Sequence, residues 1–335
     1  MRVLITGGAG FIGSHLAERW LMEGWEVAVL DDLSTGSLAN IDHLKHKPGF
    51  RFALGSVMDR SLLNELMDSC DVVYHLAAAV GVRLIVENPV QTMTTNVHGT
   101  EAVLAAAART QVPVFIASTS EVYGKSTAIP FREDADLVLG ASTKARWSYA
   151  ASKALDEFLG IAYWSHRGVP ATIVRFFNTV GPRQSERYGM VLPTFVRQAM
   201  RGDAITIFGD GEQRRCFGFV ADVVEALIRL ARAPGVSGEV INIGNDGEIT
   251  INELALLVKR TANSSSPIIH IPYDSAYGPG FEDILRRVPC LEKLHRLTGY
   301  TPETPIEEVV TAVVEHERSN YAPPPVLHPA AVLAA

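Results

Sequence analysis

Short apolar runs alternate with longer segments of helical periodicity through the first half of the chain. We expect strands at residues 3–5, 26–30, 72–76, 112–117 and 171–176. Ala-rich helical stretches lie between the later strands, at 99–110 and 149–166. Strands that are apolar on both faces and alternate with helices predict a parallel sheet with helices on each side. With right-handed crossovers, this is a doubly wound α/β fold of the Rossmann type.

The rhythm changes after Gly181, where shorter strands and helices are broken by Pro and Gly. We therefore expect a larger domain at 1–180 and a smaller C-terminal α/β domain at 181–320. An apolar run at 240–244 predicts a strand that returns to the first sheet, so that the two domains would be partly interleaved. The Pro-rich end, 321–335, is expected to be a mobile tail.

The composition is that of a globular protein with a large core, and it argues against several function classes. The 335 residues are 47% hydrophobic and carry a net charge of −7. Nucleic-acid surfaces usually show clustered Lys and Arg and an excess of positive charge, and no apolar run is long enough to span a bilayer. The first expected strand begins at Val3, so we expect no signal peptide before it. Three scattered cysteines show neither metal-ligand spacing nor a disulfide framework. We therefore expect a cytoplasmic protein without bound metal.

A glycine-rich turn stands between the first expected strand and a helix. Gly7, Gly10 and Gly13 form the pattern Gly-x-x-Gly-x-x-Gly. Glycine lets the backbone approach a pyrophosphate closely, and the N–H groups at the start of the helix bind that anion. Asp31 ends the second strand, where a carboxylate accepts hydrogen bonds from ribose hydroxyls and repels a 2′-phosphate. This context predicts a dinucleotide site that prefers NAD over NADP; the alternative is a glycine-rich turn without a ligand.

A second set of residues suits the oxidation of a hydroxyl group. Tyr149 and Lys153 are four residues apart, so they share one helix face. Tyrosine is a weak base at its ordinary pKa of about 10, but a nearby ammonium group and the positive nicotinamide ring favour the phenolate. Thr119 follows a strand and can hydrogen-bond the same substrate hydroxyl. Alone, a Tyr-x-x-x-Lys pair is common; with the dinucleotide loop and Thr119 it predicts a dehydrogenase step.

The opening segment, 6–13, resembles that of the extended short-chain dehydrogenase/reductases, the nucleotide-sugar epimerases and dehydratases. The resemblance covers nearly the whole chain and includes the segments 31–36, 75–78, 96–100, 149–153, 175–178 and 181–183. It implies an NAD cofactor and a nucleotide-sugar substrate. It also implies that the cofactor contacts, besides the three glycines and Asp31, the residues Phe11, Ile12, Asp32, Ser34, Thr35, Gly36, Ser56, Val57, Leu76, Ala77, Ala78, Tyr149 and Lys153.

Glu121 indicates which reaction follows the oxidation. Within the resembled family, 4,6-dehydratases typically carry Thr-Asp-Glu here and simple 4-epimerases usually carry no acidic residue, whereas the segment 119–121 reads Thr-Ser-Glu. That segment resembles the UDP-glucuronate decarboxylases, and Arg287 matches an arginine that is catalytic in them. The segment before Tyr149 departs from the pattern, because it lacks the Gly-Pro-Arg-x-x-Tyr of UDP-xylose synthases. Further pieces that resemble this group are 136–140, 146–149, 215–217 and 277–283.

The implied chemistry is coherent. Oxidation of glucuronate at C4 makes a β-keto acid, which loses carbon dioxide readily because the electrons delocalise into the new carbonyl. Glu121 and Arg287 are the candidates to hold the carboxylate and to protonate C5. The product is then UDP-xylose, the UDP-linked 4-keto pentose, or both. We expect the UDP-sugar to contact Ser120, Asn178, Arg183, Arg215, Arg287 and Arg83, the last with a solvated side chain as the alternative.

Three alternatives stay open. A UDP-sugar 4-epimerase would use Thr119, Tyr149 and Lys153 in the same way and rotate the keto sugar before reducing it. Glu121 could be a structural carboxylate, because ionic groups near a cleft are often structural. A non-catalytic NAD-dependent regulator on the same fold is disfavoured, because such a protein needs no base.

The remaining expectations concern helix packing and histidines. The resemblance implies a homodimer, in which the helix of Tyr149 and the helix that ends at Thr110 pack against the same pair of the partner. His75 is expected in the core and His98 at a helix start, neither of them as a metal ligand. Small side chains on the second helix would permit close approach; they are Ala102, Ala105 and Ala106.

Overall fold

The computed structural model describes residues 1–81, 88–186, 190–273, 275, 284 and 286–320; Arg83, the segment 277–283 and the expected tail at 321–335 lie outside the described residues. Its main sheet has seven parallel strands in the order β11-β6-β5-β4-β1-β2-β3. Their bounds are β1 Arg2–Thr6, β2 Glu26–Asp31, β3 Phe50–Leu54, β4 Val72–His75, β5 Val114–Thr119, β6 Ala171–Phe176 and β11 Val240–Ile243. The expected doubly wound sheet is confirmed. The return at 240–243 is confirmed as well, because β11 pairs in parallel with β6; only β3 lacks a predicted counterpart.

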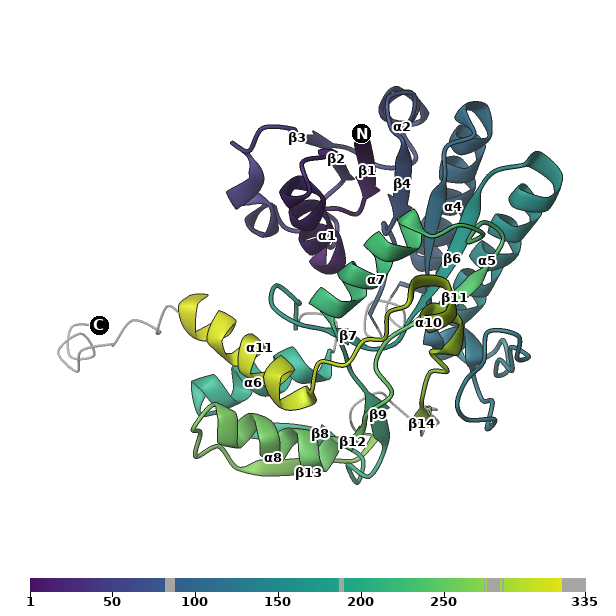
Figure 1. Cartoon of the computed structure of the whole chain (residues 1–335). Helices are drawn as coiled ribbons and strands as arrows, with labels where there is room; N and C mark the ends of the chain where they lie inside the picture. Colours follow the sequence, from purple (N-terminus) through teal and green to yellow (C-terminus); the bar gives the residue numbers. More distant parts are fainter. Residues whose placement is uncertain (82–87, 187–189, 274, 276–283, 285, 321–335) are drawn as a thin grey trace, which may run out of the picture.

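Helices cover both faces of this sheet (Figure 1). One face carries α1 (Phe11–Met22) and α7 (Val220–Arg232), while the other carries α2 (Arg60–Met67), α4 (Pro89–Thr110) and α5 (Ser148–Arg167). Side chains of a strand alternate between the two faces. In β1, Val3 and Ile5 pack toward α1 and α7, whereas Leu4 packs toward α2 and α4.

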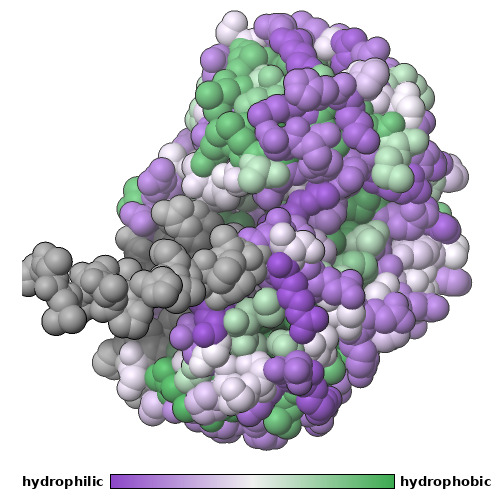
Figure 2. Space-filling view, turned by 90° about the vertical axis from the view of Figure 1, so that its left-hand side faces the viewer, coloured by the Kyte–Doolittle hydropathy of each residue, from purple (hydrophilic) through white to green (hydrophobic). Residues whose placement is uncertain are grey.

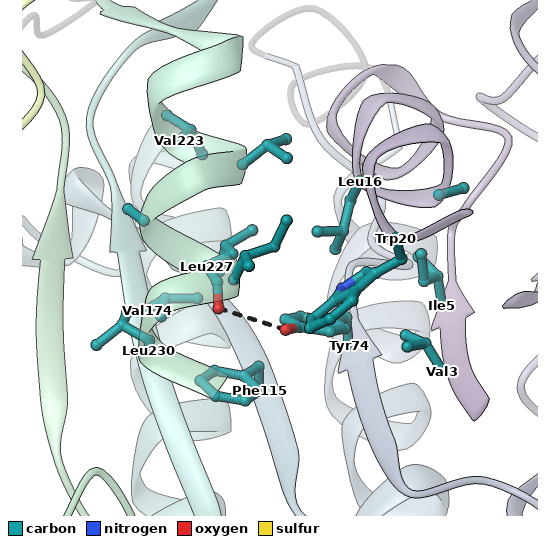
Figure 3. Close-up of a cluster of buried hydrophobic side chains, with 14 of the residues drawn as sticks. Val3, Ile5, Leu16, Trp20, Tyr74, Phe115, Val174, Val223, Leu227 and Leu230 are labelled. Atoms are coloured by element: carbon teal, nitrogen blue, oxygen red, sulfur yellow. Dashed lines mark hydrogen bonds between the residues drawn. The ribbon is translucent and has the colours of Figure 1, made fainter. Parts of the chain in front are cut away.

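Figure 3 shows the core between α1, α7 and the sheet. Trp20 and Leu16 descend from α1 and meet α7 residues such as Leu227 over strand residues that include Tyr74. The Tyr74 hydroxyl donates a hydrogen bond to the Leu227 carbonyl oxygen at 3.3 Å. A helix from beyond residue 181 therefore completes the core of the larger unit.

The smaller unit lies below the sheet in Figure 1. Its apolar core joins α6 (Val191–Arg201), α8 (Ile251–Thr261) and α11 (Ile306–Asn320) to β8 (Ile205–Phe208). The remaining strands are β7 Thr179–Val180, β9 Arg214–Cys216, β10 Gly218–Phe219, β12 Glu248–Thr250, β13 Ile268–Ile271 and β14 Arg286–Arg287. The helix α10 (Glu292–Thr298) packs against α7 and β11, and its Leu294 belongs to the core of the larger unit. The face in Figure 2 is mostly hydrophilic, and apolar side chains show in a recess between its upper and lower parts.

Two expectations about α4 were wrong. The helix begins at Pro89 rather than near residue 99, so His98 lies in its middle. Proline favours the first helical position, and the polar first half of α4 hid the helical period. Two of the three alanines expected to face a partner, Ala102 and Ala106, are instead buried against the sheet and α2 within the same chain, whereas Ala105 is exposed.

Candidate active site

A cavity of about 2280 Å³ extends from the carboxyl ends of β1, β2, β4 and β5 into the smaller unit. Ligands of open parallel sheets bind at this edge, beside the point where the strand order reverses. In this sheet the reversal lies between β1 and β4. Every described residue predicted above to serve cofactor, substrate or catalysis lines the cavity; Arg83 lies outside the described residues.

The glycine-rich turn fits a pyrophosphate. Gly7 follows β1 with a φ of +73°, and a Cβ atom there would lie 2.6 Å from the backbone nitrogen of Ala77. A Cβ atom on Gly13 would lie 2.4 Å from the Gly7 carbonyl oxygen. Gly10 is the N-cap of α1 and offers no side-chain cap, so the first N–H groups of the helix are left for an anion.

Asp31 stands at the end of β2, at the rim of the same cavity. Its carboxylate accepts hydrogen bonds from the backbone N–H groups of Ala9, at 2.9 Å, and Leu33, at 2.8 Å. Burial raises the pKa of this carboxyl above its ordinary value, although the two backbone donors act against that shift. Gly36 lies close to this carboxylate: a Cβ atom there would come within 2.9 Å of Oδ1, so a larger residue would have to displace the Asp31 side chain. The turn and this carboxylate together suit a dinucleotide.

Tyr149 opens α5 opposite Thr119, the last residue of β5. Burial raises the pKa of the Tyr149 hydroxyl, and the charges of Glu121 and Asp156 raise it further. A hydrogen bond from Thr119 and the charge of Arg146 lower it. The tyrosine is therefore protonated in the structure as it stands and needs added positive charge to become a base.

Lys153 lies one turn after Tyr149 and is almost completely buried. Its ammonium group donates to Oδ2 of Asp156 at 2.7 Å. His75 is also buried, and burial and then the charge of Lys153 lower its pKa to about 3. Its ring nitrogens contact Thr6 and Thr100, at 2.8 and 3.2 Å. The expected core histidine is thus confirmed, and it is uncharged at neutral pH.

Glu121 is buried between two arginines. It belongs to the short helix η3 (Ser120–Tyr123), directly after β5. Arg287 lies 2.9 Å from its Oε1 atom, and Arg146 donates from Nη1 to Oε2. Burial alone would raise the pKa of this carboxyl, but the charges of Arg287 and Arg146 outweigh burial and hold it at about 2. The cluster therefore combines one fixed anion with two cations.

The two arginines come from opposite sides of the cavity. Arg146 lies in η4 (Ala145–Trp147), immediately before α5. Arg287 lies in β14, which pairs with β9 so that Arg287 stands beside Arg215. The segment directly after β14 is anchored to the larger unit, because the Phe131 N–H donates to the Val288 carbonyl oxygen at 2.7 Å. Glu121 thus joins the two units at the cavity.

Three expected substrate residues already make contacts within the chain. The Asn178 amide donates to the Cys216 carbonyl oxygen at 2.9 Å. Arg215 donates to the Arg214 carbonyl oxygen at 2.9 Å. Arg183 has a φ of +69° and is turned toward α1. There it donates to Glu18 at 2.6 Å.

Sequence reasoning missed two contacts of the predicted catalytic residues. Asp156, the partner of Lys153, follows it at the i+3 position of one helix, a spacing that could have revealed the pair. Arg146 stands three residues before Tyr149, which is the place of arginine in Gly-Pro-Arg-x-x-Tyr. The departure from that pattern is therefore confined to Lys144 and Ala145.

Two absences hold for the part of the chain that the structure describes. There, no cluster of three or more His, Cys, Asp or Glu side chains is arranged to hold a metal ion. Within the same residues, no helix combines the length and apolar character needed to cross a membrane.

Comparison with known proteins gives a consistent picture. Residues 3–244 match the model of the NAD dependent epimerase/dehydratase family. The UDP-N-acetyl-alpha-D-glucosaminuronate decarboxylase of Bacillus cytotoxicus is 42% identical over 94% of this chain and 97% of its own length. UDP-glucuronic acid decarboxylase 1 of Danio rerio is 35% identical over 97% of this chain and 76% of its own length. The solved UDP-glucuronic acid 4-epimerase from Bacillus cereus, in complex with UDP-glucuronic acid and NAD, matches with a TM-score of 0.86 at 27% identity, covering 96% of this chain and 100% of that one.

Proposed function

The chain belongs to the NAD dependent epimerase/dehydratase family, and on that premise we propose that it is an NAD-dependent decarboxylase of a UDP-linked hexuronate, with UDP-glucuronate as the expected substrate. The observation that carries this proposal is the cluster of Glu121 with Arg146 and Arg287. It places two arginines around one carboxylate in the cavity that also holds Tyr149. Guanidinium groups in a cavity lining suit the carboxylate of a sugar acid.

The residues divide the reaction between them. Tyr149 would take the proton of the C4 hydroxyl, while Thr119 hydrogen-bonds that hydroxyl and Lys153 supplies positive charge. Bound NAD would accept the hydride. Arg287 would then hold the substrate carboxylate. Because the pKa of Glu121 is about 2, this side chain would serve at neutral pH as an anion that positions the arginines. Water in the cavity would then supply the proton that C5 gains after loss of carbon dioxide.

Relatives favour decarboxylation but differ in the sugar that their names state. The relative at 42% identity is named for the N-acetylated uronate, and those at 34–36% for UDP-glucuronic acid. The test is to incubate the enzyme and NAD with each UDP-sugar and to measure released carbon dioxide and the mass of the nucleotide sugar. Carbon dioxide from either sugar supports the decarboxylase. An isomer of unchanged mass would favour the 4-epimerase, and no reaction with either would favour a regulator.

We assign the cofactor preference to Asp31, which ends β2 at the cavity rim. Its carboxylate would meet the adenosine ribose, so NAD should bind much more tightly than NADP. Replacing Asp31→Ala should weaken NAD binding, as measured by fluorescence titration. Equal affinity of the unaltered protein for both cofactors would contradict this assignment.

We infer that the protein is a cytoplasmic homodimer and that α4 and α5 meet their counterparts in the partner. The support is apolar side chains exposed on these helices: Val90, Met93, Leu155 and Phe158, the last 69% exposed. Phe158→Glu should produce monomers in light scattering at micromolar concentration, because a charge would be buried at the interface. A monomeric unaltered protein would contradict the proposal.

A further inference from the structure

Arg146 binds Glu121 and stands three residues before Tyr149 in the chain. We propose that Arg146 is a positioning residue that neutralises Glu121, so that one cavity can hold both this permanent anion and a tyrosine that ionises. The inference rests on the proposed function only in taking Tyr149 as the base for C4 oxidation. It adds a charge that the oxidising set of Thr119, Tyr149 and Lys153 does not contain.

Several elements pack against α5, namely α4, β5, β6, η3 and η4. The charged and titratable groups on these and neighbouring elements bear on the ionisation of Tyr149. The groups are Lys153, Asp156 and Glu157 from α5, Glu121 from η3, Arg146 from η4, Arg175 from β6, His75 from β4, Arg287 from β14, and His98 and Glu101 from α4. Most are balanced locally. Glu157 binds Arg175, His98 pairs with Glu101 at the surface, and His75 is neutral at neutral pH.

Lys153 alone does not supply the positive charge that Tyr149 needs in order to ionise. Lys153 already binds Asp156 at 2.7 Å, so much of its field at Tyr149 is cancelled by that carboxylate. The other carboxylate of the site, Glu121, disfavours the phenolate. Arg287 approaches Glu121 at Oε1 and is the arginine proposed to turn toward the substrate. Arg146 binds the other oxygen, Oε2. It therefore stays to balance the negative charge of Glu121 when Arg287 turns toward the substrate.

The position of Arg146 is fixed by its surroundings. Its side chain is only 5% exposed, and its guanidinium lies over the ring of Trp147, 5.6 Å from the centroid. That ring is held against Gly140, where a Cβ atom would lie 2.0 Å from the indole nitrogen. A buried cation held in this way costs no reorganisation when the tyrosine loses its proton.

The test is the pH dependence of NAD reduction by the UDP-sugar, a step that precedes loss of carbon dioxide. Arg146→Gln should move the rising limb of that profile to higher pH by on the order of one unit. Glu121→Gln should move it to lower pH, because the opposing anion is gone. The double variant should return close to the original limb. Lys125→Gln is the matched control, since Lys125 lies over the same Trp147 ring, at 5.7 Å, but is outside the cavity; it should not move the limb.

A second measurement keeps this test separate from the proposed reaction. The ultraviolet absorbance of tyrosinate in the NAD-bound protein, with Tyr149→Phe subtracted, reports ionisation without any sugar. Arg146→Gln should shift that titration in the same direction, and Arg146→Lys should restore part of it. An unshifted titration in a folded Arg146→Gln variant overturns the inference, as does a double variant that stays as alkaline as Arg146→Gln. Inactivity of the unaltered protein toward both UDP-sugars would instead sink the proposed function and leave the absorbance test valid.

Discussion

Two buried glutamates near the carboxyl end of β5 each bind arginine, yet they form different kinds of site. Glu157 meets one arginine: Arg175 donates from Nε at 2.9 Å and from Nη2 at 2.6 Å. Ser118 donates to the same carboxylate, and the guanidinium lies over the Tyr123 ring, 4.7 Å from its centroid. Neither Glu157 nor Arg175 is among the described residues that line the cavity. Here each charge is matched one to one.

Glu121 is instead shared by two arginines from two different elements, and all three side chains line the cavity. The two sites therefore differ in where they lie. A charge pair away from the cavity lining is expected to act on stability. A cluster of charged side chains on the cavity wall can contact an anionic ligand at little cost in reorganisation.

The largest effect should come from changing the cluster of Glu121 with its two arginines. Glu121→Gln keeps the shape of the side chain and removes its charge, so carbon dioxide release should fall by about 10²–10⁴ while the fold and NAD binding persist. Arg287→Ala should also raise the KM for the UDP-sugar, because the guanidinium holds an anionic group. Release of carbon dioxide from the labelled carboxyl group measures both effects. A Glu121→Gln rate within a few-fold of the unaltered enzyme would make Glu121 structural and move the 4-epimerase ahead.

Changing the Glu157–Arg175 pair should have the opposite result, a loss of stability with little loss of activity. Glu157→Gln leaves Arg175 buried without its charge partner, which should lower the free energy of unfolding by about 3–5 kcal/mol. Urea unfolding measures this loss, and kcat of the folded protein at low temperature should stay within a few-fold. The double change Glu157→Gln with Arg175→Met should recover part of the stability, since no buried charge remains. Loss of kcat without loss of stability would contradict the distinction drawn between the two clusters.

The fold could be predicted largely from the apolar pattern, because the central strands are buried on both faces. The edge strand β3 was not predicted, since exposed residues such as Arg51 interrupt its apolar pattern. The start of α4 at Pro89 was not predicted, because the first turns of this helix are polar. The packing of α7 against α1 was not predicted either, because the sequence of a helix does not show which sheet it will cover.

The parts of the site that are formed by residues close together in the sequence could be predicted. The glycine turn, Asp31 and the Tyr149–Lys153 spacing are all local, and all lie in one cavity. The approach of Arg287 to Glu121 joins residues far apart in the chain and was reachable only through resemblance. Arg183 was expected at the substrate, but its backbone is left-handed and its side chain turns toward Glu18. The sequence does not reveal this conformation, because the residue is not a glycine.

A third effect, on acid stability, should sharpen the contrast further. The pKa of Glu121 in the folded protein is about 2, because Arg287 and Arg146 outweigh burial, against about 4.3 when unfolded. The stability that this pairing supplies is therefore fully present above the unfolded value and is lost as pH falls through the folded one. The gap in unfolding free energy between the unaltered protein and Glu121→Gln should narrow from about pH 4.5 toward pH 2. A gap that stays constant over this range would mean that the carboxyl is not held ionised.

The smallest effect should come from a pair that fits neither class. Arg183 donates to Glu18 at 2.6 Å, and His43 lies 3.4 Å from the same carboxylate oxygen. The Arg183 and Glu18 side chains are 18% and 32% exposed, and they bridge the loop after β7 to α1. Water screens such a pair, so Glu18→Gln should cost about 1 kcal/mol or less in unfolding. Because Arg183 lines the cavity, freeing its loop should still raise the KM for the UDP-sugar a few-fold with little change in kcat. Comparison with Arg183→Ala decides how that arginine acts. Equal changes in KM mean that it works through Glu18 by positioning the loop. A far larger change in Arg183→Ala would mean that the guanidinium binds the nucleotide sugar directly.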